Sequence, residues 1–276
     1  MLGKYSGLRM GRGKAVALAA IAAAALCVAA VSLAHAELSE RGGLFVRFKG
    51  GIDPNALPRT ELAPIAVSVA GTIKTLSGER PPSLRRIRIE LNRGGVLDSR
   101  GLPDCHYREL IAASAAQAMA ACGGALVGSG SYSAETAFPE QQTFPSQGKI
   151  RAFNGTYGGG EAILAHIHGN DPGPITRIIV FHVRRQAGTF GTILTGNLPD
   201  SLNHYGYVIG IHLRLFRRYT FGGERRSYIS AACAAPQGFD IATFPFARAS
   251  MKFADGRRLS STLTRSCRVR GYGVAQ

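Results

Sequence analysis

Short runs of alternating apolar and polar residues, separated by Gly, Pro, Asn and Asp, fill the chain after Glu37. Alternation with a period of two places successive side chains on opposite faces of an extended strand. Hairpin signals join several of these runs, at Asn154-Gly155, Gly222-Gly223 and Asp255-Gly256. The pattern predicts an all-β fold, an antiparallel β-sandwich of the jelly-roll type. The expected strands are Leu44–Lys49, Ile65–Thr75, Leu84–Leu91, Gly124–Ser133, Lys149–Phe153, Glu161–His168, Ile175–Arg185, Thr189–Thr195, Tyr207–Tyr219, Arg225–Ala232, Ala247–Ala254 and Leu259–Cys267.

The hairpin at Gly222-Gly223 can be followed residue by residue. A two-residue turn there sets Thr220 opposite Arg225. The same register points His212 and Arg214 toward solvent, on the face opposite the apolar residues. His212 then lies among cations, and neighbouring positive charge opposes a bound metal ion.

One short helix is expected among the strands. Ser114-Ala115-Ala116-Gln117 is a capping box, in which the Ser hydroxyl and the Gln amide satisfy free backbone N–H groups at a helix start. Gly123-Gly124 ends the helix, so it spans Ala115 to Ala121.

The first 36 residues have the features of an export signal. A basic start without acidic residues leads into an uncharged apolar stretch over 15–34, which ends in Ala34-His35-Ala36. This order is typical of a cleaved secretory signal peptide. We expect a secreted, extracellular protein whose single β-sandwich domain spans 37–276. The alternative is an uncleaved segment that tethers the protein to a membrane. No second apolar run of this length follows, so no transmembrane segment is expected after signal removal.

Four cysteines remain in the exported chain, Cys105, Cys122, Cys233 and Cys267. An even number in an exported protein predicts two disulfides. Three pairings are possible, and we favour the local one, Cys105–Cys122 with Cys233–Cys267. A single helix over 106–121 would hold its ends about 24 Å apart, whereas a disulfide needs Cα atoms within about 7 Å. The chain must therefore double back before the capping box.

Positive charge is the main functional hint in the composition. Lys and Arg number 33 against 17 Asp and Glu, a formal net charge of +16. Arg doublets occur at Arg85-Arg86, Arg184-Arg185, Arg217-Arg218, Arg225-Arg226 and Arg257-Arg258. If the strand ends that carry them gather at one pole, they form a positive rim suited to an anionic partner. The alternative is a coding bias toward Arg, with doublets on solvated faces.

We expect the anion-binding surface at Arg217, Arg218, Arg225 and Arg226, which flank one turn. Outside a cell, the expected partners are anionic cell-wall polymer or lipid headgroups, and no specific nucleic acid. A module that stacks sugar rings is less favoured because the chain contains no Trp. These features favour a non-enzymatic protein of the cell envelope.

The segment "AILAHIHG" (162–169) is the one stretch that suggests a metal centre. Gly160, five residues and then His166-x-His168 resemble the opening of the first motif of cupins, which are metal-binding β-barrels. That motif continues with a Glu, whereas here Gly169-Asn170-Asp171 follows. The resemblance implies the alternative function, a small cupin-like metal-dependent enzyme that uses His166 and His168.

A metal site needs a third ligand, and His182 on the next strand is the nearest candidate. With the turn centred on Asp171, His182 falls opposite Glu161 and faces the other side of the sheet. A one-residue slip sets it opposite Ala162 instead, roughly 13 Å from His166, too far to share an ion. No GxSxG elbow or phosphate-binding loop occurs either. We therefore expect no metal, no cofactor and no catalytic residues.

Three further segments carry a family resemblance. They are "LRRIRIELNRGGVLDSRGLPDC" (84–105), "GALVGSGSYSAETAFPEQQTFPSQGKIRAFNG" (124–155) and "FPFARASMKFADGRRLSSTLTRSCRVRG" (244–271). They resemble a family of uncharacterised secreted proteins of high-GC Gram-positive bacteria. The resemblance covers most of the chain after the signal and implies export and both local disulfides. It brings no activity with it.

Overall fold

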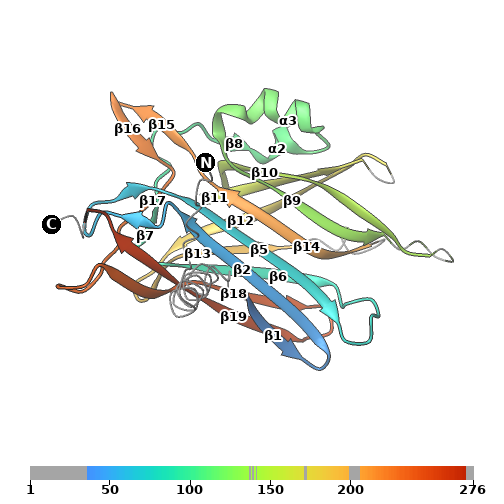
Figure 1. Ribbon diagram of the computed structural model, residues 1–276. Helices are drawn as coiled ribbons and strands as arrows, with labels where there is room; N and C mark the ends of the chain where they lie inside the picture. Colours follow the sequence, from blue (N-terminus) through green and yellow to red (C-terminus); the bar gives the residue numbers. More distant parts are fainter. Residues whose placement is uncertain are drawn as a thin grey trace, which may run out of the picture. The chain divides into compact units, whose positions relative to one another are not determined.

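Strands account for 64% of the chain and helices for 7%, which confirms the predicted all-β fold class. The structure, a computed structural model (Figure 1), describes residues 36–136, 138, 140, 142–170, 173–198 and 206–271. The predicted export signal therefore lies outside the described residues, apart from Ala36.

Most of the strands belong to one large sheet of 14 strands. Its order is β1-β2-β5-β14-β9-β10-β11-β12-β13-β6-β18-β19-β3, and β8 pairs with β10. The strands are β1 (Glu37–Arg41), β2 (Leu44–Asp53), β3 (Ala56–Leu57), β5 (Ala66–Thr75), β6 (Leu84–Asn92), β8 (Cys105–His106), β9 (Leu126–Thr136), β10 (Phe144–Tyr157), β11 (Gly160–Gly169), β12 (Ile175–Arg185), β13 (Phe190–Asn197), β14 (Gly206–Leu215), β18 (Ile241–Phe253) and β19 (Arg258–Val269).

Two small sheets and a helical segment complete the described part of the chain. The small sheets are β15 (Arg218–Phe221) with β16 (Glu224–Ser227), and β4 (Ala63–Pro64) with β17 (Ile229–Ala231) and β7 (Gly95–Leu97). The helices are α2 (Tyr107–Leu110), α3 (Ala115–Cys122) and the 3-10 turn η1 (Gly123–Ala125). None of the helices that the structure describes has the length and apolar character needed to cross a membrane.

The large sheet curls until its last long strand meets its first two. β19 lies against β1 and β2. Across this seam, Arg265 Nε donates a hydrogen bond to the Gly50 carbonyl at 2.7 Å. Arg257 Nη1 likewise donates to the Gly42 carbonyl at 2.9 Å. The two halves of the sheet therefore face each other across one core, as the layers of a sandwich do.

The core is built by the alternation that the sequence shows. Every second residue of the long strands points inward, and most of these side chains are aliphatic or aromatic. A second apolar cluster lies on the outer face of β10 and β11, under α2 and α3 (Figure 1). Its buried members are Cys105, Leu110, Ala113, Ala118, Cys122, Ala125, Phe153, Ala162 and Leu164.

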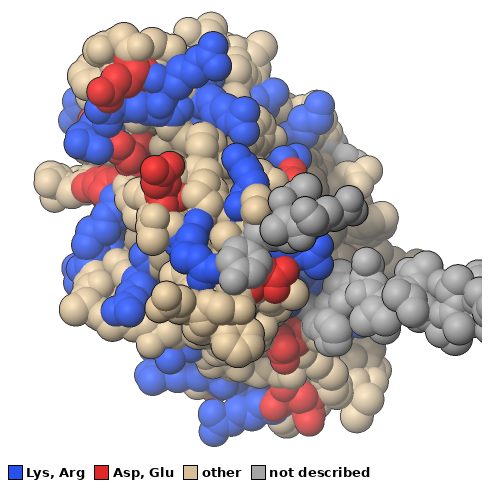
Figure 2. All heavy atoms as spheres, turned by 60° about the vertical axis from the view of Figure 1, so that its left-hand side comes forward, with Lys and Arg blue, Asp and Glu red and all other residues tan. Residues whose placement is uncertain are grey.

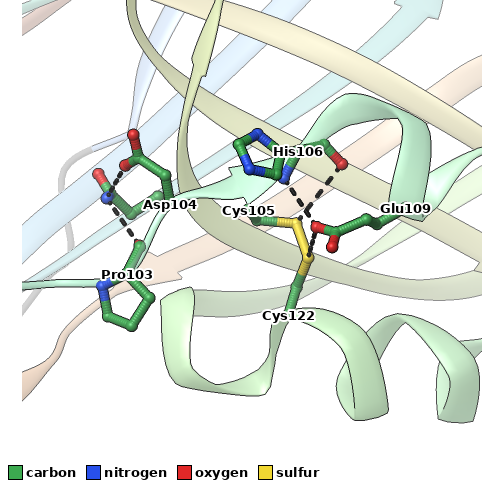
Figure 3. The surroundings of a disulfide bond; sticks show 7 residues. Pro103, Asp104, Cys105, His106, Glu109 and Cys122 are labelled. Carbon is green, nitrogen blue, oxygen red and sulfur yellow. Dashed lines mark hydrogen bonds between the residues drawn. A yellow bond between two sulfur atoms is a disulfide. The ribbon is translucent and has the colours of Figure 1, made fainter.

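The helical segment doubles back as the disulfide geometry requires. Ser114 caps α3, and both halves of the capping box with Gln117 are present. An additional single-turn helix, α2, precedes it, because Glu109 accepts a hydrogen bond from the His106 backbone N–H. Cys105 and Cys122 then lie 5.3 Å apart at Cα and form a disulfide (Figure 3). Cys233 and Cys267 form the second one, so both expected pairings are confirmed.

The predicted turn at Asn154-Gly155 is wrong. β10 runs through these residues, and the turn comes later, at Gly158-Gly159, where both φ angles are positive. The Asn154 side chain is buried and donates hydrogen bonds to the Pro103 carbonyl and the Asp104 carboxylate (Figure 3). At Gly155, a Cβ atom would overlap the Cys105 carbonyl, so only glycine lets β8 approach β10. The Asn-Gly pair thus anchors the helical segment.

The other two hairpin turns occur where the sequence predicts them. Gly222-Gly223 joins β15 to β16 with Thr220 opposite Arg225. Asp255-Gly256 lies in the turn between β18 and β19, and Gly256 has a φ of 84°. Positive φ is the conformation that favours glycine at such turns.

Close approach of β9 to β14 depends on Gly130. A Cβ atom there would overlap the His212 carbonyl of the neighbouring strand. We expect Gly130→Ala to lower the free energy of unfolding by about 1–3 kcal/mol, measured by urea unfolding. Gly51→Ala is the matched control, since a Cβ atom at that strand position meets nothing within 4 Å. Equal effects of the two substitutions would contradict the close-approach argument.

The two disulfides close loops of different length, with sequence separations of 17 and 34. Chain entropy then predicts contributions of about 3 kcal/mol for Cys105–Cys122 and about 4 kcal/mol for Cys233–Cys267. We expect the Cys233→Ala/Cys267→Ala variant to lose more stability in urea unfolding than the Cys105→Ala/Cys122→Ala variant. The reverse order would show that packing around the bridges outweighs loop length.

Candidate anion-binding groove

The two histidines of "AILAHIHG" point the same way from β11, as their spacing predicts. Their rings stack with centroids 6.0 Å apart. His166 is completely buried, whereas His168 is partly exposed. The loop between α2 and α3 covers His166, because its Nε2 lies 2.9 Å from the Ala113 carbonyl.

A small hydrogen-bond network assigns the proton positions on both rings. The Ala113 carbonyl can only accept, so His166 Nε2 carries a proton and donates to it. Thr176 Oγ1 donates to the same carbonyl at 2.8 Å. Since its proton is used there, Thr176 Oγ1 accepts from His168 Nδ1 at 3.0 Å. The histidines therefore hold the helical segment on the sheet.

This arrangement does not favour the metal-dependent alternative. β12 pairs with β11 in the slipped register, with His182 opposite Ala162 and therefore far along the strand from His166. Over the part of the chain that the structure describes, the only metal-type ligand cluster is Cys105, Glu109 and Cys122. Its two sulfur atoms are bonded to each other (Figure 3), so they are not available as thiolate ligands.

The four arginines around the Gly222-Gly223 turn do not share one face. Pairing in the hairpin puts Arg218 and Arg225 on one side and Arg226 on the other. Arg226 forms ion pairs with Asp98 at 3.3 Å and Glu224 at 2.9 Å. Figure 2, in which this end of the sheet comes forward, shows acidic side chains among the basic ones. The charge of Arg226 is therefore neutralised locally, whereas Arg218 and Arg225 lie on the other side of the hairpin.

A larger basic surface lies on the outer face of β2, β5, β14, β9 and β10. Strand pairing aligns two cross-strand rows over these five strands. The first row is Lys49, Ala70, His212, Ser131 and Lys149, and the second is Arg47, Thr72, Gly210, Ser133 and Gln147. Each row spans four strand spacings, about 19 Å. We call this surface the outer groove.

The outer groove is hollow because its floor consists of small residues. Two adjoining depressions of about 660 and 540 Å³ share Ala70, Gly71 and Thr72. At Gly210, a Cβ atom would come 2.5 Å from Ser133 Oγ, so a side chain there would disturb the floor. The hydroxyls of Thr72, Ser131 and Ser133 line the hollow and offer hydrogen bonds to a ligand.

Cations line the outer groove and carboxylates do not. Its basic side chains are Arg47, Lys49, Lys74, Lys149 and His212, and all five are exposed. No Asp or Glu occurs among the described residues that line either depression. Arg214, two residues from His212 on β14, forms an ion pair with Asp53 at 3.1 Å. The electrostatic field over the groove is therefore positive.

Buried His166 gives the fold a defined dependence on pH. Burial lowers the pKa of His166, and the nearby His168 and Arg151 lower it further. Below about pH 6.5 the His166 side chain is protonated in the unfolded chain but stays neutral in the folded protein. The free energy of unfolding therefore falls as the pH drops below about 6.5. We expect this loss in urea unfolding, with a slope of up to about 1.4 kcal/mol per pH unit.

The His166→Gln variant should keep a donor near the Ala113 carbonyl and abolish this slope. His182→Gln, on the neighbouring strand but outside the network, is the control and should retain it. An unchanged slope in His166→Gln would assign the pH dependence to other groups.

No family model matches this chain. No curated protein matches it either, and no solved structure does. The function is therefore argued from the groove itself.

Proposed function

We propose that this chain is an exported, disulfide-stabilised binding protein that holds an extended anionic polymer of the cell envelope in the outer groove. The observation that carries this proposal is the pair of cross-strand rows with Lys49 at one end, Lys149 at the other and no carboxylate in the described lining. A protein of this kind needs no catalytic residues. It needs a rigid, positively charged and hydroxyl-lined surface.

The shape of the groove favours a linear polymer over a compact anion. Its rows run across five strands, and cations occur along the whole length rather than around one point. Antiparallel pairing fixes the spacing between the strands, so the binding groups are preorganised. Hydroxyl and amide side chains between the cations suit a polymer that carries sugar or glycerol hydroxyls beside its charges.

Export and envelope attachment are consistent with the rest of the molecule. Two disulfides fit an oxidising compartment outside the cytoplasm. A formal net charge of +16 draws the protein toward anionic surfaces at low ionic strength. The resemblance to secreted proteins of high-GC Gram-positive bacteria points to the same location.

The decisive experiment compares double charge reversals that change the net charge equally. Lys49→Glu/Lys149→Glu alters the two ends of the outer groove. Lys252→Glu/Arg258→Glu alters a directly paired cation pair on the outer face of β18 and β19. Binding to a purified poly(glycerol phosphate) chain is measured by isothermal titration calorimetry. We expect the groove variant to lose at least tenfold in affinity and the β18–β19 variant to lose much less.

Salt dependence provides a second measurement on the same complex. Three contacts to phosphates imply that affinity falls roughly 20-fold between 50 and 200 mM salt, by the counterion slope of about 0.7 per contact for single strands. Equal losses in both reversal variants would show binding to net charge rather than to the groove. Absence of binding at 50 mM salt, or binding to anionic vesicles alone, would overturn the proposal.

A further inference from the structure

A cavity of about 310 Å³ lies inside the curled sheet, on the inner side of the strands that form the outer groove. Most of its lining is apolar, from Ile167, Ile179, Leu198, Val208 and Ile211. The volume is that of roughly ten water molecules, which is at the lower end of the range of small-molecule pockets. The cavity and the outer groove lie on opposite faces of the same strands, because alternate residues of a strand face opposite sides, and Tyr132 and Ile211 line both.

One charged side chain lines this cavity. Arg177 points inward from β12, opposite Ile167 of β11. Its Nη1 donates to the Thr176 carbonyl at 2.9 Å, while its Nε is buried and has no hydrogen-bond partner. No Asp or Glu is among the described residues that line the cavity. Arg177 is partly buried, and its Nε is a buried donor that no group of the protein satisfies, which is energetically unfavourable.

A second donor lies at the same end of the cavity. The ring of Tyr132 passes over Gly148, and its hydroxyl sits where a Cβ atom of Gly169 would be. Gly169 pairs with Ile175, which is two residues from Arg177 along β12. Gly169 and Arg177 are therefore diagonal neighbours on adjacent strands, about 7–8 Å apart. Burial raises the pKa of Tyr132, which keeps the phenol protonated as a donor.

The phenol of Tyr132 has a partner in the protein and still has donor capacity. Ser146 forms a hydrogen bond with Tyr132, and a phenol oxygen can accept from a Ser hydroxyl while it donates its own proton to a ligand. Tyr132 O–H and the Arg177 guanidinium then supply donors without an acceptor of opposite charge. An oxyanion, and a carboxylate in particular, matches this pair, because it accepts two hydrogen bonds from a guanidinium.

The other large cavity of the protein lacks such a feature. It measures about 420 Å³ and lies near the Cys233–Cys267 disulfide. Asn92 lines it, but its amide nitrogen already donates to the Pro245 carbonyl and its oxygen accepts from Gly94. Thr243, which also lines this cavity, shares a hydrogen bond between its hydroxyl and that of Ser266. Only the Arg177 cavity therefore combines an apolar enclosure with an unsatisfied cationic group among the cavities described.

We propose that the cavity at Arg177 and Tyr132 binds a monocarboxylate with a hydrocarbon body of about ten carbon atoms. The carboxylate lies against the guanidinium and the phenol, and the hydrocarbon fills the space among Ile167, Ile179 and Ile211. The site is independent of polymer binding in the outer groove.

The experiment titrates the full-length protein with decanoate and with 1-decanol by calorimetry at pH 7. The two probes share a hydrocarbon chain and differ in the head group. We expect decanoate to bind at least tenfold more tightly than the alcohol. In Arg177→Met this preference should disappear while the alcohol still binds, because the apolar walls are unchanged.

Two further variants keep the result interpretable. Tyr132→Phe should weaken decanoate binding about ten- to a hundredfold, the usual range for one hydrogen bond to a charged group. Arg214→Met removes an exposed arginine of the outer face and should leave decanoate binding unchanged. Arg177→Met should also unfold at the same or a higher urea concentration than the parent, because it removes a buried Nε donor that has no partner.

Failure of decanoate to bind, or equal binding of acid and alcohol by the parent protein, would overturn the proposal. The proposal would also be overturned if Arg177→Met were less stable than the parent and Tyr132→Phe preferred decanoate over the alcohol as strongly as the parent does. In that case Arg177 would have a structural role.

Discussion

The meeting of β19 with β1 and β2 is the constraint on which the rest of this structure depends. An open sheet of this length would expose unpaired backbone groups along both edges. The curl brings the edges together, and the Arg265 guanidinium donates a hydrogen bond to the Gly50 carbonyl across the seam. Burial lowers the pKa of Arg265, and the contact with the carbonyl offsets part of the cost of placing the guanidinium there. Once the seam is closed, the sheet has an apolar inner face that forms the core and an outer face that faces solvent.

Both proposed binding sites follow from this separation of the two faces. Ser131 and Ser133 of β9 point outward and line the outer groove, whereas Tyr132 between them points inward to Arg177. One three-residue stretch thus serves two surfaces of opposite character. Small residues on the outer face form the floor of the outer groove. On the inner face, Gly148 and Gly169 leave space for the ring of Tyr132.

Local features of the fold could be predicted from the sequence, and long-range ones could not. The capping box at Ser114, the Gly222-Gly223 turn and the doubling back between Cys105 and Cys122 depend on neighbouring residues and were all predictable. Asn154-Gly155 has the local signature of a turn. Instead, both residues contact a segment 50 residues earlier, because Asn154 donates a hydrogen bond to Asp104 and Gly155 pairs with Cys105. Tertiary packing overrode the local preference there.

The outer groove was invisible to sequence reasoning for a related reason. Its members come from five strands that are adjacent only after the sheet has formed, and Lys49 and Lys149 are 100 residues apart. Doublets such as Arg225-Arg226 attract attention because they are contiguous, yet neighbouring residues in a strand face opposite sides. Single basic residues at matching register positions are the relevant pattern, and only strand order reveals it. Burial of His166 likewise depends on a loop that precedes it by more than 50 residues.

Closure by the C-terminal strand has a consequence for the order of events during biosynthesis. β19 ends at Val269, and β1 and β2 lie at the start of the described part of the chain. Every N-terminal fragment that stops before β19 therefore lacks the seam, and its edge strands stay unpaired. Contacts of such high sequence separation form slowly. Closure of the sheet therefore has to wait until β19 has been synthesised.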